Sequence, residues 1–138
     1  MKYVANILFL LFSMSAQTSE LTMLTDLSSL QWKNRLVVVN DVQNEGRVLA
    51  LFEKNTSEIN NRDIVWFIFK GNQAFTNYPG KLSEDFLDNT RERYRVGQGE
   101  VVLIGKDGGA KSRLDRVDLE TIFAEIDAMP MRQNEMRN

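Results

Sequence analysis

The 138-residue chain contains neither cysteine nor histidine. Without cysteine it can form no disulfide and has no thiolate nucleophile, so thiol–disulfide exchange and cysteine-based peroxide reduction are excluded. Without histidine it lacks the commonest general base at neutral pH and the commonest side-chain ligand of metal ions. We therefore expect no metal site and no cofactor. The 17 basic and 19 acidic residues leave a net charge of −2, which provides no electrostatic surface for nucleic acid.

The first 19 residues have the composition of an export signal. Lys2 provides a short positive segment, and residues 7–12 form an apolar run that is too short to span a bilayer. Small residues from Ser13 to Ala16 then offer a cleavage site. We therefore predict a signal peptide over residues 1–19, a single domain over residues 20–138, and a periplasmic or secreted protein without membrane insertion after cleavage. The alternative is a retained membrane anchor.

Hydrophobic patterns over residues 20–138 predict four strands and four helices. Three apolar runs have the length of strands buried on both faces, and Asp107-Gly108-Gly109 predicts a hairpin turn into a fourth. The predicted strands span residues 35–40, 63–70, 101–105 and 110–114. The predicted helices begin at capping residues Asp26, Asp41, Ser83 and Asp118. The second helix is expected to run to about Glu58, Pro130 to end the last helix, and residues 71–80 to form a loop.

The resulting order of elements is β-α-β-α-β-β-α. Two buried strands joined by a helix are expected to lie parallel with a right-handed crossover, and the last two strands are expected to form an antiparallel hairpin. This combination predicts an α/β, thioredoxin-like fold, in which a four-stranded mixed sheet carries helices on both faces. The helix after Asp26 would be an addition at the amino end.

Four segments of the chain together form a recognisable signature. They are residues 30–35 (Leu-Gln-Trp-Lys-Asn-Arg), Arg62-Asp63, residues 103–111 (Leu-Ile-Gly-Lys-Asp-Gly-Gly-Ala-Lys) and residues 126–132 (Ile-Asp-Ala-Met-Pro-Met-Arg). The signature resembles that of a bacterial family, the thioredoxin-like domain of unknown function DUF4174, from Leu24 to Arg137. That family is similar to extracellular domains of vertebrate sushi-repeat-containing and coiled-coil-containing matrix proteins. The resemblance implies the fold and an extracytoplasmic compartment, but no activity, substrate or cofactor.

The chain departs from the redox members of this fold at the positions that carry their chemistry. Thioredoxin-like enzymes place a reactive cysteine where the first strand meets the first long helix, because a helix N-terminus stabilises a thiolate. Here that junction is Asn40-Asp41-Val42-Gln43-Asn44, and Gly97-Gln98-Gly99-Glu100 stands where redox members carry a cis-proline. The analogy to redox enzymes therefore fails. Asp41 and Gln43 could form a binding site at the junction, or Asp41 could simply cap the helix.

The predicted topology gathers polar residues at one end of the sheet, which we call the amino pole because the two parallel strands begin there. The hairpin turn and the end of the last helix should reach the same pole. In a structural interpretation, three arginines pair with three aspartates beside Trp32: Arg35, Arg62 and Arg132 with Asp63, Asp107 and Asp127. In a functional interpretation, the pole is a recessed site for an anion or a peptide, lined by Arg35, Lys106, Asp107, Lys111 and Arg132.

These patterns favour a non-enzymatic binding or interaction module, with an unknown protein or a small anionic ligand as partner and a monomer or weak dimer as the oligomeric state. The alternative is an enzyme of unknown class that uses lysine, arginine and aspartate at the amino pole, and a purely structural role is a third interpretation. A copper(I) site made of Met129, Met131 and Met136 is a further hypothesis, although Met129 falls on the apolar stripe of the last helix.

Overall fold

The computed structural model describes residues 23–138, so the predicted export signal lies outside the described residues. The strands are β1 (Arg35–Asn40), β2 (Ile64–Lys70), β3 (Gln73–Thr76), β4 (Val101–Ile104) and β5 (Ala110–Leu114). The helices are the 3₁₀ helix η1 (Leu27–Leu30) and the α-helices α2 (Glu45–Lys54), α3 (Thr56–Asn61), α4 (Phe86–Tyr94), α5 (Leu119–Asp127) and α6 (Pro130–Arg137). None of the helices in this part of the chain has the length and apolarity that a membrane crossing requires.

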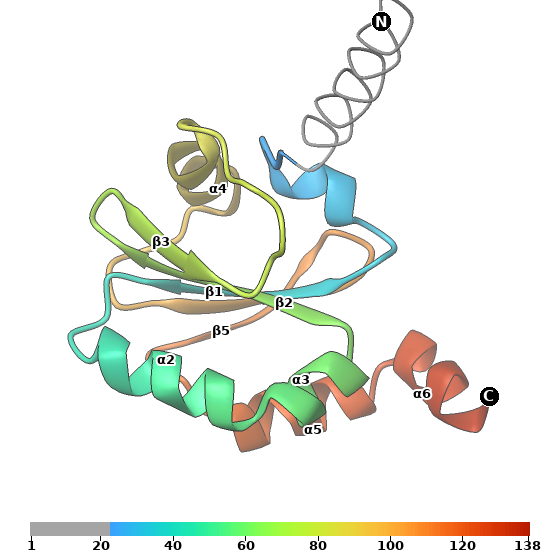
Figure 1. The fold of residues 1–138 in the computed structure, drawn as a ribbon. Helices are drawn as coiled ribbons and strands as arrows, with labels where there is room; N and C mark the ends of the chain where they lie inside the picture. Colours follow the sequence, from blue (N-terminus) through green and yellow to red (C-terminus); the bar gives the residue numbers. More distant parts are fainter. Residues whose placement is uncertain (1–22) are drawn as a thin grey trace, which may run out of the picture.

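The strands form one mixed sheet in the order β3-β2-β1-β4-β5 (Figure 1). β1 and β2 are parallel, and every other neighbouring pair is antiparallel, as expected for a central βαβ unit followed by a hairpin. The predicted bounds of the first and last strands are confirmed. The predicted number of strands is wrong, because the sheet has five strands rather than four.

The additional strand is β3, which lies within the segment predicted as a loop. Gly71 has a left-handed φ of 57°, and this conformation allows a tight turn in which Lys70 pairs with Gln73. The four residues of β3 alternate between exposed and half-buried positions at the edge of the sheet. Such a short, largely polar strand lacks the apolar run from which the buried strands were predicted.

Each face of the sheet is covered by helices, as predicted (Figure 1). Alternate residues of β1 point to opposite faces, so Val37 and Val39 pack with α2, α3 and α5, whereas Leu36 and Val38 pack with η1 and α4. All six residues of β1 are buried. Its position between two apolar layers explains why its sequence is a continuous hydrophobic run.

Two predicted helix starts are wrong. Asp41 does not cap α2: it has a left-handed φ of 51° and accepts a hydrogen bond from the Gly71 backbone N–H at 2.8 Å. Asn44 occupies the N-cap position instead. Ser83 likewise stands before the helix α4, whose N-cap residue is Asp85. By contrast, Asp26 and Asp118 cap η1 and α5 as predicted, through their side-chain oxygens.

The predicted second helix is divided in two. Asn55 ends α2, and its side-chain amide donates to the Leu51 carbonyl oxygen at 2.8 Å, before α3 begins. At the carboxyl end, α5 stops before Pro130, as predicted, but the same proline is the first residue of the additional helix α6. Proline suits this position because it has no N–H to leave unbonded and its φ is already helical.

The structure predicts that Asn77 is important for stability although its side chain is largely exposed. Its amide accepts from the Trp66 N–H at 2.8 Å and donates to the Ile64 carbonyl at 3.1 Å, completing the ladder of β2 beyond the end of β3. Asn77→Ala should lower the free energy of unfolding by about 1–3 kcal/mol, because both backbone groups lose their partner. Urea denaturation would measure the change, and Asn72→Ala in the adjacent turn is the matched control. Equal stabilities of the two variants would contradict this role.

Candidate functional site

The amino pole is built around the buried guanidinium of Arg35, the first residue of β1. Its side chain is only 1% exposed, and its two terminal nitrogens donate to the two carboxylate oxygens of Glu135 at 3.1 and 3.0 Å. One of these nitrogens also donates to the Arg62 carbonyl oxygen at 3.0 Å. A paired, fork-shaped contact of this kind is the geometry in which arginine and carboxylate interact most strongly.

Lys106 connects this pair to the hairpin between β4 and β5. Its ammonium lies 2.9 Å from a carboxylate oxygen of Glu135 and 2.9 Å from one of Asp63. Partial burial pushes the pKa of Glu135 upward, but the hydrogen bonds from Arg35 and Lys106 outweigh burial and leave the pKa below its ordinary value. Glu135 is therefore an ionised carboxylate shared by two cations at neutral pH.

A second group of ion pairs fastens α5 and α6 to the start of β2. Asp127 accepts from Arg62 at 3.1 and 2.8 Å and from Arg132 at 3.0 Å. The hydrogen bonds from Arg62 are the main reason why the pKa of Asp127 lies below its ordinary value, with partial burial acting against them. The guanidinium of Arg132 also donates to Asn61, to the backbone carbonyl oxygen at 3.0 Å and to the side-chain oxygen at 2.6 Å.

The structure brings most of the predicted residues together. Arg62 and Arg132 pair with Asp127, within the predicted set of arginines and aspartates, but Asp63 and Asp107 pair with lysines instead. Asp107 pairs with Lys111 at 2.7 Å, and this contact lowers the pKa of Asp107. The main partner of Arg35 is Glu135, which sequence reasoning missed because it lies on α6, a helix that was not predicted. Glu135 follows Arg132 by three positions, a spacing that places both side chains on one face of a helix.

A pocket of about 290 Å³ opens beside this network. Four of the five residues predicted to line a site here do line this pocket, namely Arg35, Lys106, Asp107 and Lys111. The rest of its lining is Trp32, Gly105, Met129, Pro130 and Met131. Arg132 does not line it, since its guanidinium is turned toward Asn61 and Asp127. The exposed surface of the pocket is largely apolar. The charged side chains in its lining are engaged in ion pairs.

Trp32 stands at this pocket in an unusual conformation. Its φ is 69°, in the left-handed region where bulky residues are rare, and its side chain is 61% exposed. The Trp32 N–H donates to the Lys106 carbonyl oxygen at 2.6 Å, and the neighbouring Gln31 side chain donates to the Asp107 carbonyl oxygen at 2.8 Å. The hairpin turn thus holds Trp32 in place with its ring toward solvent.

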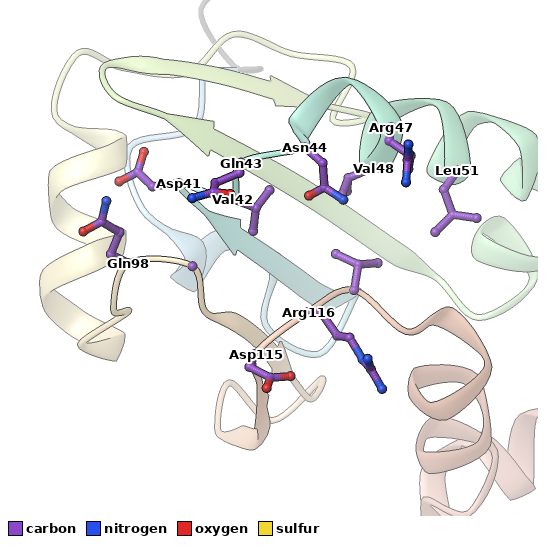
Figure 2. Close-up of a pocket in the computed structure, with 12 residues that line it drawn as sticks. Asp41, Val42, Gln43, Asn44, Arg47, Val48, Leu51, Gln98, Asp115 and Arg116 are labelled. Atoms are coloured by element: carbon purple, nitrogen blue, oxygen red, sulfur yellow. The ribbon is translucent and has the colours of Figure 1, made fainter.

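A second pocket, of about 630 Å³, lies at the opposite end of the sheet, which we call the carboxyl pole because β1 and β2 end there (Figure 2). It occupies the junction of β1 and α2. Asp41 and Gln43 both line it, but the carboxylate of Asp41 is bound to the Gly71 N–H and lies 3.4 Å from Arg91. Asp41 therefore connects the end of β1 to the turn after β2 and to the helix α4.

The side chains that could bind a metal ion are dispersed over the described part of the chain. Within residues 23–138, no group of three or more histidine, cysteine, aspartate or glutamate side chains could hold a metal ion. Met129 and Met131 line the pocket at the amino pole, and Met136 does not. Met129 packs partly against the apolar core, as its place on the α5 stripe suggested.

The sequence profile of a known family, described as a domain of unknown function (DUF4174), matches residues 26–135. The chain belongs to the DUF4174 family. No curated protein shows significant sequence similarity to it. Among solved structures, the mitochondrial 2-Cys peroxiredoxin from Plasmodium falciparum is similar, with a TM-score of 0.51 and 14% identity over 74% of this chain and 79% of that one. This likeness supports the thioredoxin-like fold of the DUF4174 domain and nothing about its chemistry.

The ion pairs of Glu135 make the stability of this DUF4174 domain depend on pH. Glu135→Gln should lower the free energy of unfolding at neutral pH by about 2–4 kcal/mol, because the buried Arg35 loses its carboxylate. Since the pKa of Glu135 is lowered in the folded state, its contribution is complete above the ordinary value of 4.5 and is lost as pH falls through the lowered value.

Urea midpoints of the wild type and the variant, measured at a series of pH values, should therefore differ most at neutral pH and converge in acid. Glu120→Gln, which changes an exposed glutamate of α5, is the control and should leave the curve unchanged. A difference that stays constant in acid would show that the Glu135→Gln variant is destabilised by poor packing rather than by the loss of charge.

Proposed function

We propose that this protein is a non-enzymatic interaction module that binds a partner protein at the amino pole. The observation that carries this proposal is Trp32, a large aromatic side chain held exposed, by a left-handed backbone, beside an apolar pocket. The pocket has room for one apolar side chain of the partner. Tryptophan at the edge of such a pocket is the residue type that most often dominates the binding energy of protein interfaces.

The geometry favours an apolar anchor over a small anion. Lys106 lies against two carboxylates, Arg35 is bound to Glu135, and Lys111 is bound to Asp107. A bound anion would have to compete with these carboxylates. An apolar side chain would instead cover Met131, which is 41% exposed, and the ring of Trp32, without disturbing any ion pair.

The same pairing weakens the alternative of an enzyme at this pole. A catalytic lysine or aspartate needs a free side chain that can reach a substrate. Here the carboxylates of Asp63 and Asp107 each face a lysine ammonium within 3 Å. The arrangement is that of a rigid support for a binding surface, and we propose a monomer or weak dimer as its oligomeric state.

Binding through the amino pole predicts a specific peptide preference. In a screen of short synthetic peptides, we expect binders to share one apolar anchor residue, and Trp32→Ala to weaken them at least tenfold, as expected for a residue worth about 2 kcal/mol. Fluorescence polarisation of labelled peptides would measure the affinities.

Phe75→Ala is the matched control, since Phe75 is also an exposed aromatic residue but lies on β3, away from this pocket. Binders that lack an apolar residue, or that tolerate Trp32→Ala as well as Phe75→Ala, would refute the proposal. The thermal stability of both variants should stay close to that of the wild type, because both side chains are exposed.

We also propose that the protein acts outside the cytoplasm, on the strength of the signal-like composition of residues 1–19. Expressed in a bacterial host, the protein should be recovered from the periplasm or the medium. N-terminal sequencing should place its first residue just after the small residues that follow the apolar run. Recovery in the membrane fraction with an intact N-terminus would show a retained anchor instead.

A further inference from the structure

A third hollow, of about 670 Å³, lies between the edge strand β3 and the helices α2 and α3, which cover that face of the sheet (Figure 1). We call it the edge groove. Its volume is within the range of about 300–1,000 Å³ that is usual for small-ligand sites. It shares no lining residue with the pocket beside Trp32 or with the pocket at the junction of β1 and α2, so it is a separate site.

Trp66, on β2, places an unpaired hydrogen-bond donor in the edge groove. Trp66 is only 6% exposed, and its ring packs against that of Phe52, with 5.0 Å between the ring centroids. Its indole N–H has no acceptor among residues 23–138, but it keeps contact with solvent, unlike the enclosed and unpaired hydroxyl of Thr90. A tryptophan buried to this extent normally has a partner for its N–H. The groove thus contains a rigidly held donor to which a bound molecule can present an acceptor.

An exposed aromatic ring lies next to this donor. In the register of β2 and β3, Phe75 pairs with Ile68, so Trp66 is its diagonal neighbour on the same face of the sheet. Diagonal neighbours of this kind are about 7–8 Å apart, within reach of aromatic side chains. Phe75 is 39% exposed and lines the groove. Because the face of an aromatic ring carries partial negative charge, it attracts polarised C–H bonds such as those of a sugar ring.

The wall opposite β3 adds two further polar groups. The side chains of Glu53 on α2 and Asn60 on α3 are exposed and form no hydrogen bond or ion pair with another residue of the described part of the chain. Leu49 and Ile59 add apolar surface to this wall. Among residues 23–138, no lysine or arginine lines the groove. The edge groove therefore combines one carboxylate, one amide and one indole donor with apolar surface.

These groups select an uncharged, hydroxyl-rich molecule. An anion would face the carboxylate of Glu53 with no cation in the lining to offset it. A simple ammonium ion could pair with Glu53 but has no acceptor for the indole N–H of Trp66. A hydroxyl group both donates and accepts, so neighbouring hydroxyls of one molecule can accept from Trp66 and donate to Glu53.

We propose that the edge groove binds a neutral saccharide of one or two rings. One sugar ring stacks on Phe75, its hydroxyls bond to Trp66 and Glu53, and the amide of Asn60 both donates to and accepts from the same molecule. The edge groove is distant in the chain and in the fold from the amino pole, so this inference does not depend on the function proposed above.

The indole signals of a ¹H–¹⁵N NMR spectrum provide the test, because the chain has only two tryptophans, Trp32 and Trp66. Maltose, cellobiose, lactose and N,N′-diacetylchitobiose would be titrated one at a time into the purified protein, and Trp32→Phe would assign the two signals. We expect at least one of these disaccharides to shift the indole N–H signal of Trp66 and to leave that of Trp32 in place.

Phe75→Ala and Glu53→Gln should each weaken the disaccharide that binds best by about tenfold, since one removes the stacking surface and the other a hydrogen bond to a charged group. Both side chains are exposed, so both variants should fold normally. Glu92→Gln is the matched control, because Glu92 is an exposed glutamate of α4, on the other face of the sheet, and it should leave the affinity unchanged.

The proposal is overturned if none of the four disaccharides shifts the Trp66 signal, if the Trp32 signal shifts equally, or if the Phe75 and Glu53 variants bind as tightly as Glu92→Gln. Acetyl-triglycine amide, a peptide with donors and acceptors but no sugar ring, would be titrated in parallel. A larger shift of the Trp66 signal with this peptide than with every disaccharide would assign the groove to peptides and overturn the proposal as well.

Discussion

The packing of the amino pole depends on one charge, the guanidinium of Arg35. It is almost completely buried at the start of the central strand, and a buried charge without a partner would cost several kcal/mol. Its partner comes from α6, about a hundred residues later in the chain. Among the eight residues of α6 only Arg132 is buried, so polar contacts rather than an apolar face hold this helix in place. The position of Met131, and with it the shape of the first pocket, follows from that attachment.

The two poles of the sheet use arginine in opposite ways. At the amino pole Arg35, Arg62 and Arg132 are each bound by a carboxylate, and the surface beside them is the apolar one around Trp32. At the carboxyl pole Arg47 and Arg116 stand beside an apolar floor. Between the poles lies a sheet whose central strand is buried on both faces, which makes each pole a separate surface on a common rigid support.

The sequence was sufficient where a long hydrophobic run marks a buried strand, as in β1, or where a turn motif marks a hairpin, as before β5. The bounds of β1 and β5, the cap at Asp118 and the convergence of polar residues at one pole were all predicted. It was insufficient where a short polar segment depends on tertiary contacts, as in β3, which exists because it pairs with β2. The same reason applies to α6 and Glu135: a helix with one buried residue has almost no apolar period. Asp41 was misjudged because its left-handed backbone suits a loop contact rather than a cap.

The two outer strands have a consequence for how copies of this molecule can meet. β3 offers only four residues at one edge of the sheet, and β5 is irregular where it passes Ile104 and carries Lys111 and Arg113 at the other. Short, bulged and positively charged edges resist the addition of a further strand from another chain. The sheet is thus protected against edge-to-edge aggregation.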